Sequence, residues 1–584
     1  MVLLTGNKPG TINALRKKLI STFCVIISMT ILTDGTTIEK YTREGWWDNK
    51  TLIGRFIEDS EKNPERIAII DAPNKHDLVG LDPERISYGE LRKRVDRLAS
   101  FFMDIGVKKD DIISIQLPNI NELLTTYLAA WRIGAAISPV PMQWRSHELG
   151  YVFKLTGSNV FVSTTFRDFD HCAMAEGIRK EKGPPEKVVN LGQVRAAMTT
   201  HDISDELDDR TASLGANDVS TIQWTSGTEK DPKACPMSHN NWGFLRYFFD
   251  SRHLGGILKD GYIIMNPAPL VNMTGIGVGV VPWLIVAGTM VLHHPFDPTM
   301  YFRQLIQEKV NFTLAVPAVA VAMLKHPDVD KFDLSSVKLF TQGSSQPSPW
   351  TFLEFKKRWG IESINVWGQN EGTGLFSTSE VIPDLESRAN TFPWPRAENH
   401  SKIPFFKAIE TKIVDTESGK EVTKPGEVGE LCFKSPLTIP GYYNDAGLNK
   451  KAFDTGGFFR TGDLFRIVDD KRIAFFDRAK DIIIRGGFNI SSAEIEDIIK
   501  KDPRILDVAA IGIPDERLGE RVCVCVVPRE GSTVALPDIV KIMEENGVAK
   551  YKWPERLETV KSIPRNPVGK AIKWQLRKDV ASKL

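Results

Sequence analysis

The sequence has little of what marks secreted, metal-binding or nucleic-acid-binding proteins. It has only six cysteines in 584 residues, and only Cys523 and Cys525 lie close together, which indicates a reduced, intracellular protein rather than a disulfide scaffold. None of the ten histidines occurs in a metal-ligand spacing such as H-x-x-x-H with an intervening glutamate. The 75 Lys and Arg residues nearly cancel the 74 Asp and Glu residues. No long-range field therefore attracts a polyanion, which argues against a nucleic-acid partner.

Long apolar runs are also missing, except near the N-terminus. Residues 19–32 are mostly apolar and follow Arg16, Lys17 and Lys18. The run is short for a membrane span and has the size of a signal-peptide core, but no small-residue cleavage site follows it. Met29 lies inside the run, so one interpretation is that translation starts there and residues 1–28 are not native. A disordered extension and an export signal are the alternatives.

From about residue 50 the sequence alternates helical and strand-like patterns, as in α/β proteins. Ser87 and Glu90 form an S-x-x-E capping box ahead of apolar residues at helical spacing, and Gly106 is suited to end that helix. Residues 176–216 are polar and contain Gly and Pro, which predicts a surface excursion rather than core. Further expected elements are a strand at residues 112–117, a helix at 122–133 and a strand at 135–140.

The last hundred residues predict a separate unit. Ser491 and Glu494 form a second capping box at the start of an apolar-periodic helix. Cys523 and Cys525 alternate along a predicted strand and so face the same side of it. The other expected elements are strands at residues 508–513 and 521–527 and a helix at 539–545.

These patterns predict a multi-layer α/β protein with two domains. We expect an extension over residues 1–45, a large N-terminal α/β domain over 46–477 and a smaller, mobile C-terminal α+β domain over 481–584. A charged link lies between two apolar runs and is suited to a hinge at 478–480. We expect no membrane span in the mature domains and a cytoplasmic location.

Residues 225–233, TSGTEKDPK, hold the most informative local pattern. They follow a strand-like run, and their hydroxyls and glycine let the backbone close around phosphate oxygens, while Lys233 adds positive charge. The segment is not a Walker loop, because G-x-x-x-x-G-K-[ST] is absent. A serine hydrolase is excluded too, since G-x-S-x-G is absent. Taken alone, such a cluster is more often a solvated turn.

The segment is the first of six motifs, and together they carry a specific resemblance. They are TSGTEKDPK at 225–233, WGQNE at 367–371, GEL at 429–431, RTGD at 460–463, RAKD with two following glycines at 478–487, and PRNPVGK at 564–570. In this order the chain resembles the adenylate-forming (ANL) superfamily of acyl-CoA synthetases, peptide-synthetase adenylation domains and luciferases. The resemblance covers roughly residues 50 to 580 and favours the acyl-CoA synthetase branch.

The resemblance implies that ATP, Mg²⁺ and coenzyme A bind this chain. It makes Glu371 the Mg²⁺ ligand, Trp367 an adenine-stacking ring, Asp463 the acceptor of the ribose hydroxyls and Arg478 a ribose or phosphate ligand. The other residues that it assigns to cofactor binding are Thr225, Ser226, Gly227, Thr228, Lys233, Ser344, Ser345, Gln346, Gly368, Gln369 and Asn370.

The small domain has its own implied roles. Lys570 is the catalytic residue by resemblance: it reaches the substrate carboxylate and the α-phosphate, where charge builds. Lys480 is the implied hinge about which the small domain rotates between the two half-reactions. Gly486, Gly487 and Phe488 match the loop that admits the pantetheine arm of coenzyme A.

The chain departs from the family pattern at several positions. In the phosphate loop Glu229 replaces a Thr or Ser, and Lys230 and Ala234 each replace a Gly. Asn370 replaces the usual Thr but keeps hydrogen-bonding capacity, and Asp477 replaces a Gly before the hinge arginine. None of these changes removes a group that the chemistry needs.

The position that holds an Asp in amino-acid-activating relatives is Met273 here, which argues against an amino-acid substrate. Asn272, Gly275 and the small apolar residues that follow suit an acyl pocket, and Gln143 is a weaker candidate for its border. We therefore expect a small-molecule carboxylic acid, ATP and coenzyme A as partners, and an oligomer is compatible with the sequence. Two alternatives stay open: a stand-alone acyl-AMP ligase that loads a carrier protein, and a non-enzymatic nucleotide-binding relative.

Overall fold

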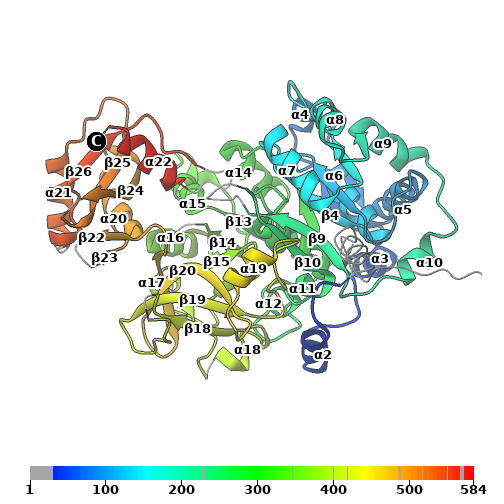
Figure 1. The fold of residues 1–584 in the computed structure, drawn as a ribbon. Coiled ribbons are helices and arrows are strands. Elements are labelled where there is room, and N and C mark those ends of the chain that lie inside the picture. Colours follow the sequence, from blue (N-terminus) through cyan, green and yellow to red (C-terminus); the bar gives the residue numbers. More distant parts are fainter. Residues whose placement is uncertain are drawn as a thin grey trace, which may run out of the picture.

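The protein has a mixed α/β fold with a large N-terminal domain and a smaller C-terminal domain (Figure 1). The computed structural model describes residues 31–225, 231–344, 346–398, 400–416, 418–485, 488–515, 517–546, 548, 550–565 and 571–583. Among these, three main sheets build the large domain and one builds the small domain. The described helices include none that is both long and apolar enough to cross a bilayer.

A six-stranded sheet with the order β10-β9-β4-β3-β5-β8 forms the first layer. Its strands run parallel except for the β9–β10 pair, so their carboxyl ends meet at one edge. The strands are β3 (Ile112–Gln116), β4 (Ala136–Pro139), β5 (Val160–Ser163), β8 (Lys187–Asn190), β9 (Val219–Trp224) and β10 (Ala234–Ser238). The helices of this region are α5 (Tyr88–Asp104), α6 (Asn121–Arg132), α7 (Ser146–Thr156), α8 (His171–Lys182), α9 (Leu191–Thr200) and α10 (Leu207–Ala212).

Capping begins α5 where the sequence predicts it. The hydroxyl of Ser87 accepts a hydrogen bond from the backbone N–H of Glu90 at 3.3 Å, and the helix buries Leu91, Val95 and Leu98. Helix α6 and strands β3 and β4 lie within one residue of their predicted bounds. The βαβ layering read from the sequence is therefore confirmed.

The prediction for residues 176–216 is wrong. This segment contains β8, which extends the sheet beside β5, and α9, which packs on α5 and buries Val194 and Met198. Its polar residues lie on the outer faces of short elements, so the average polarity of the segment hides one buried side per element. The buried side chains of β8 and α9 are part of the hydrophobic core of the large domain.

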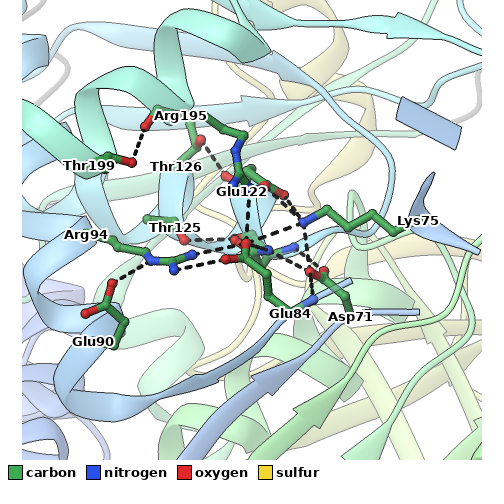
Figure 2. A network of polar contacts seen from close by, with 11 residues as sticks. Asp71, Lys75, Glu84, Glu90, Arg94, Glu122, Thr125, Thr126, Arg195 and Thr199 are labelled. Atoms are coloured by element: carbon green, nitrogen blue, oxygen red, sulfur yellow. Dashed lines mark hydrogen bonds and ion pairs between the residues drawn. The ribbon is translucent and has the colours of Figure 1, made fainter. Parts of the chain in front are cut away.

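A network of buried ion pairs joins α5, α6 and α9 to the segment that contains Asp71 and Lys75 (Figure 2). Lys75 is fully buried, and its Nζ lies 2.8 Å from Asp71 and 3.0 Å from Glu122. Arg195 of α9 forms an ion pair with Glu122 at 2.6 Å, and Arg94 of α5 forms one with Glu84 at 3.0 Å. Buried charges persist only when they are paired and hydrogen-bonded, so the network fixes how these segments meet.

An eight-stranded sheet with the order β16-β15-β14-β13-β11-β12-β1-β2 forms the second layer, parallel in its middle and antiparallel at both edges. Its strands are β1 (Ile67–Ile70), β2 (Arg85–Ser87), β11 (Ile263–Met265), β12 (Thr289–Val291), β13 (Phe312–Ala315), β14 (Leu339–Gly343), β15 (Glu362–Gln369) and β16 (Thr373–Ser377). The α-helices of this part are α3 (Leu52–Lys62), α4 (Lys75–Val79), α11 (His239–Gly243), α12 (Arg246–Phe249), α13 (Val281–Ile285), α14 (Pro298–Gln307), α15 (Pro317–Leu324), α16 (Pro349–Trp359) and α17 (Leu385–Asn390).

An antiparallel five-stranded sheet with the order β17-β21-β20-β19-β18 completes the large domain. Its strands are β17 (Phe392–Pro393), β18 (Glu410–Val414), β19 (Val428–Lys434), β20 (Phe459–Ile467) and β21 (Arg472–Arg478). Strand β21 ends at the first residue of the predicted hinge, 478–480. The large domain also contains three further short helices, α2 (Gly35–Arg43), α18 (Pro404–Lys407) and α19 (Ala446–Ala452).

The small domain packs three helices against strands β22–β26. Ser491 caps α20 as predicted, because its hydroxyl accepts from the N–H of Glu494 at 3.1 Å, but the Glu494 carboxylate binds Lys552 at 2.8 Å and so does not complete the capping box. Cys523 and Cys525 are both fully buried in the same apolar cluster, as expected for one face of a strand. The elements are β22 (Ile483–Arg485), β23 (Phe488–Ile490), α20 (Ser492–Ile499), β24 (Ile505–Asp515), β25 (Gly519–Pro528), α21 (Leu536–Glu545), β26 (Arg556–Thr559) and α22 (Lys573–Ala581).

Candidate active site

A cavity of about 580 Å³ lies where strand ends of both parallel sheets converge. Thr225 follows β9, Ser344 follows β14, and residues 367–371 form the end of β15 and the turn after it. In open α/β sheets ligands bind beyond the carboxyl ends of the strands. The five-stranded sheet and the hinge region close the cavity with Asp463, Arg478 and Lys480 among other residues.

The base of the phosphate segment is closed by two hydrogen bonds. The N–H of Thr225 donates to the carbonyl oxygen of Lys233 at 3.0 Å, and the N–H of Lys233 donates to the hydroxyl of Thr225 at 3.2 Å. Both residues line the cavity, so the ends of the segment open toward it. The predicted ligands between them, Ser226, Gly227 and Thr228, lie outside the described residues.

Glu371 is a nearly buried carboxylate on the cavity wall. The hydroxyl of Tyr442 donates to its Oε1 at 2.7 Å, and Lys233 Nζ lies 5.4 Å from the centre of the same tyrosine ring. Burial raises the pKa of Glu371, while the hydrogen bond from Tyr442 and the charge of Lys233 act the other way. A cation at this carboxylate would offset the cost of its burial.

Asp463 is a second carboxylate in the cavity lining. Its Oδ2 accepts from Trp367 Nε1 at 2.8 Å and from Gln369 Nε2 at 2.9 Å. Arg478 pairs with Asp463 in the β20–β21 register, and its Nε lies 3.8 Å from Oδ1. Two donors thus fix Oδ2, while Oδ1 lies beside a cation.

The Trp367 ring itself is only 9% exposed and stands edge-on to Phe465, with ring centroids 5.2 Å apart. Only a small part of the ring is therefore available to a stacking base. Its indole N–H is committed to Asp463, so the ring also positions that carboxylate. The sequence alone does not reveal this second role.

The β-bulge before Asp463 in β20 is held by two residues to which the sequence assigns no role. Glu430 accepts from the N–H of Gly462 at 3.0 Å and from Arg460 NH2 at 2.6 Å. Gly462 has a φ of +67°, which favours glycine. GEL and RTGD, read as separate motifs, are thus one structural unit, and Glu430 and Arg460 both line the cavity.

The other predicted nucleotide ligands divide into two groups. Ser344 and Gly368 line the cavity, whereas Gln346 is absent from the lining and donates its amide to the carbonyl oxygen of Ala389. Ser345 lies outside the described residues. Asn370 lines the cavity with its amide bonded to main-chain groups of Trp224 and Met273.

The hinge and small-domain predictions are covered only in part. Lys480 lines the cavity, and its carbonyl oxygen accepts from Arg577 at 3.3 Å. Gly486, Gly487 and Lys570 lie outside the described residues, and so does the side chain of Phe488. Their predicted roles stay predictions.

The apolar wall of the cavity comes from a π-helix, η1 (Met273–Val280), a rare element that is frequent at functional sites. Met273 and Asn272 line the cavity. Gly275 is instead packed against the main chain, because a Cβ there would lie 2.1 Å from the carbonyl oxygen of Pro269. Gln143 is exposed and is absent from the lining, which contains its neighbours Pro141 and Trp144.

Two family models match most of the chain. Residues 56–443 match the family model of the AMP-binding enzyme, and residues 494–570 match that of the AMP-binding enzyme C-terminal domain. The chain belongs to the AMP-binding enzyme family. Adenylate formation with ATP is the chemistry of this family, and the expected membership of the adenylate-forming superfamily is confirmed.

The similar curated proteins include both acyl-CoA and acyl-AMP ligases. The 2-hydroxy-7-methoxy-5-methyl-1-naphthoate–CoA ligase of Streptomyces carzinostaticus is 30% identical over 559 residues, which cover 92% of this chain and 94% of the relative. The medium-chain fatty-acid–CoA ligase of Escherichia coli K12 is 28% identical over 551 residues, covering 93% of each. The 2,3-dihydroxybenzoate-AMP ligase of Bacillus subtilis 168 is 28% identical over 554 residues, covering 94% of this chain and 96% of the relative.

Solved structures of similar fold include ATP-bound MatB from Rhodopseudomonas palustris, with a TM-score of 0.77 at 24% identity, covering 91% of this chain and 99% of that one. The anthranilate CoA ligase AuaEII in complex with anthranoyl-AMP aligns with a TM-score of 0.78 at 19% identity, covering 92% and 98%. At these identities the likeness concerns the fold. It confirms the two-domain α/β architecture.

Proposed function

We propose that this chain is an AMP-forming carboxylic acid:CoA ligase. The observation that carries the proposal is a single cavity in which the polar groups of Asp463, Arg478 and Glu371 and the apolar wall beside Met273 face the same space. A nucleotide and an apolar acid can bind there with their reacting ends together. Similarity to curated CoA ligases over more than nine-tenths of the chain supports the same reaction.

In the proposed first step, a carboxylate oxygen of the acid attacks the α-phosphorus of ATP, the bond from that phosphorus to the bridging oxygen breaks, and pyrophosphate leaves. No side chain has to take a proton, because the substrate is already ionised. Catalysis then consists of positioning and of stabilising developing charge. Lys233 and Arg478 bring positive charge to the cavity, and Lys570 would add more from the small domain.

Glu371 fits a Mg²⁺ ion, because the Tyr442 hydroxyl occupies only Oε1 and hard cations prefer carboxylate and phosphate oxygens. When bound, the ion would neutralise charge on the phosphates. The described residues hold no cluster of three or more His, Cys, Asp or Glu side chains suited to a metal, so its further ligands would be phosphate oxygens and water.

In the proposed second step, the thiolate sulfur of coenzyme A attacks the acyl carbon, the bond from that carbon to the AMP oxygen breaks, and AMP leaves. The thiol proton goes to solvent. The loop at Gly486 and Gly487, which resembles the pantetheine entry of the family, would admit the thiol arm. Glycine suits such a close approach because it has no side chain.

A second candidate is an acyl-AMP ligase that loads a carrier protein. The 28% identity to the 2,3-dihydroxybenzoate-AMP ligase favours it, over a similar share of the chain. Both candidates share the first step and differ in the thiol acceptor. In either case the described residues of η1 that line the cavity, Met273, Thr274, Gly277 and Val278, include no carboxylate to pair with a substrate ammonium, which argues for an acid without an amino group there.

The test of adenylation is acid-dependent exchange of labelled pyrophosphate into ATP, screened over short, medium, long and aromatic acids with Mg²⁺. We expect exchange with at least one apolar acid. Asp463→Asn should reduce it, whereas Asp469→Asn, a control whose carboxylate binds Arg472 outside the cavity, should not. ATP binding without exchange for any acid would refute the proposal and favour a non-enzymatic nucleotide-binding role.

A further inference from the structure

The side-chain amide of Asn370 bridges two segments that are far apart in the sequence. Its Nδ2 donates to the carbonyl oxygen of Trp224 at 2.8 Å, and its Oδ1 accepts from the N–H of Met273 at 2.9 Å. Its own carbonyl oxygen accepts from Gln223 Nε2 at 2.7 Å. Because a carbonyl only accepts and an N–H only donates, these partners fix which end of the amide faces which segment.

Each bridged segment leads into one half of the cavity. Trp224 is the last residue of β9, and the next residue, Thr225, begins the phosphate segment that Lys233 closes. Met273 is the first residue of η1, the apolar wall. The first N–H groups of a helix have no partner within it, and Asn370 supplies one for Met273. The amide therefore lies between the expected nucleotide side and the expected acid side.

We propose that Asn370 is a positioning residue that couples the acid pocket to the nucleotide pocket. This rests on the proposed function, since acid and ATP are taken to bind on the two sides of the amide. An acid that settles against Met273 fixes the amide, which in turn holds the end of β9 and the start of the phosphate segment. The threonine usual in the family carries its donor and its acceptor on one oxygen, whereas the amide carries them on two separate atoms that point to different segments.

Two variants separate the two contacts. Asn370→Leu removes both hydrogen bonds while keeping a side chain branched at Cγ, and Asn370→Asp keeps an acceptor for the Met273 N–H but sets a carboxylate oxygen against the Trp224 carbonyl. Asn365→Leu is the matched control, because Asn365 lies on β15, the strand that leads into Asn370, is buried, donates to the Ala389 carbonyl at 2.9 Å and is absent from the cavity lining.

Hydrogen exchange followed by mass spectrometry tests the bridge without any substrate. In Asn370→Leu we expect exchange about fivefold faster, the scale of one hydrogen bond, both at the start of η1 and in the peptide with Thr225 and Lys233. Asn370→Asp should accelerate only the second peptide, and Asn365→Leu neither. Parent rates at both sites in Asn370→Leu would overturn the proposal. This test needs no acid substrate. A failure of the proposed bridge can therefore be distinguished from a failure of the proposed ligase activity.

Ligand binding then tests the coupling, with ATP and Mg²⁺ as the nucleotide probe and benzoate or octanoate as the acid probe. Asn370→Leu should abolish the tightening of ATP binding by the acid and raise the KM for the acid more than it lowers kcat. A tenfold weaker ATP affinity without acid, with the acid effect intact, would identify Asn370 as a direct ligand contact and overturn the proposal.

Discussion

The side chain of Asp477 connects the large domain to the small domain. The residue lies in β21 of the large domain and is only 3% exposed. Its Oδ2 accepts from the hydroxyl of Ser492 at 2.8 Å, from the hydroxyl of Ser491 at 3.2 Å and from the N–H of Ala493 at 3.2 Å. All three donors lie at the start of α20, where a carboxylate also interacts favourably with the helix dipole.

Asp477→Ala should weaken the contact between α20 and β21. A hydrogen bond to a charged group contributes about 1.5–3 kcal/mol, and the interaction of a carboxylate with the helix dipole adds about 0.3–1 kcal/mol. These contributions are not additive in full, so we expect a loss of about 3 kcal/mol. A free-energy change of about 1.4 kcal/mol alters an equilibrium constant tenfold, so the equilibrium constant for undocking of α20 from β21 should rise about a hundredfold.

Hydrogen exchange in α20 and limited proteolysis in the link 478–482 measure this opening. Both should accelerate strongly in Asp477→Ala, while the core of the large domain keeps its exchange rates. Asp502→Ala is the control, since Asp502 binds Arg504 within the small domain and does not bridge. Parent rates in α20 and in the link would refute the assigned role of Asp477.

Three further predictions concern catalysis, acid stability and the buried charges. Lys570→Ala should slow pyrophosphate exchange by about 10²–10³-fold, the scale of one transition-state charge contact, yet spare thioester formation from supplied acyl-AMP; equal loss in both half-reactions would make the residue structural. Burial lowers the pKa of His239 to about 3, so the unfolded chain takes up its proton first as the pH falls, and the contribution of His239 to stability is full above about pH 6.5 and is lost below it. Between pH 7 and 5 the parent should lose about 2 kcal/mol more stability than His239→Gln in urea titrations, and parallel pH profiles would contradict this. Lys75→Met should cost about 3–5 kcal/mol of unfolding free energy, because Asp71 and Glu122 are left buried without their shared cation; a melting temperature near that of the parent would contradict the importance of the network.

Local signals in the sequence predicted the parts of the fold that depend on near neighbours. The capping residues Ser87 and Ser491 begin helices where predicted, because an N-cap acts only three residues along the chain. Strand β8 was missed because four residues carry too few apolar positions to stand out from a polar stretch. Its place in the sheet is decided by pairing with β5, which local sequence does not encode.

The same distinction holds in the active site. Motif order predicted that Asp463, Glu371 and Lys233 would share a cavity, and all three line it. The partners that hold them were not predictable: Tyr442 meets Glu371 across 71 positions, and Asn370 meets Trp224 across 146. Such contacts arise only when distant segments pack, so a motif gives the identity of a functional group but leaves its support unspecified.

Adenylation followed by transfer to coenzyme A can be tested on one preparation of the protein. The measurement is the release of AMP and the formation of acyl-CoA, by mass spectrometry, from the acid that gives the fastest pyrophosphate exchange. We expect stoichiometric acyl-CoA and AMP only when coenzyme A is present, and we expect Gly487→Leu to suppress acyl-CoA formation while it retains pyrophosphate exchange. Acyl-AMP that accumulates unchanged in the presence of coenzyme A would contradict transfer to coenzyme A and point to a carrier protein as the acceptor.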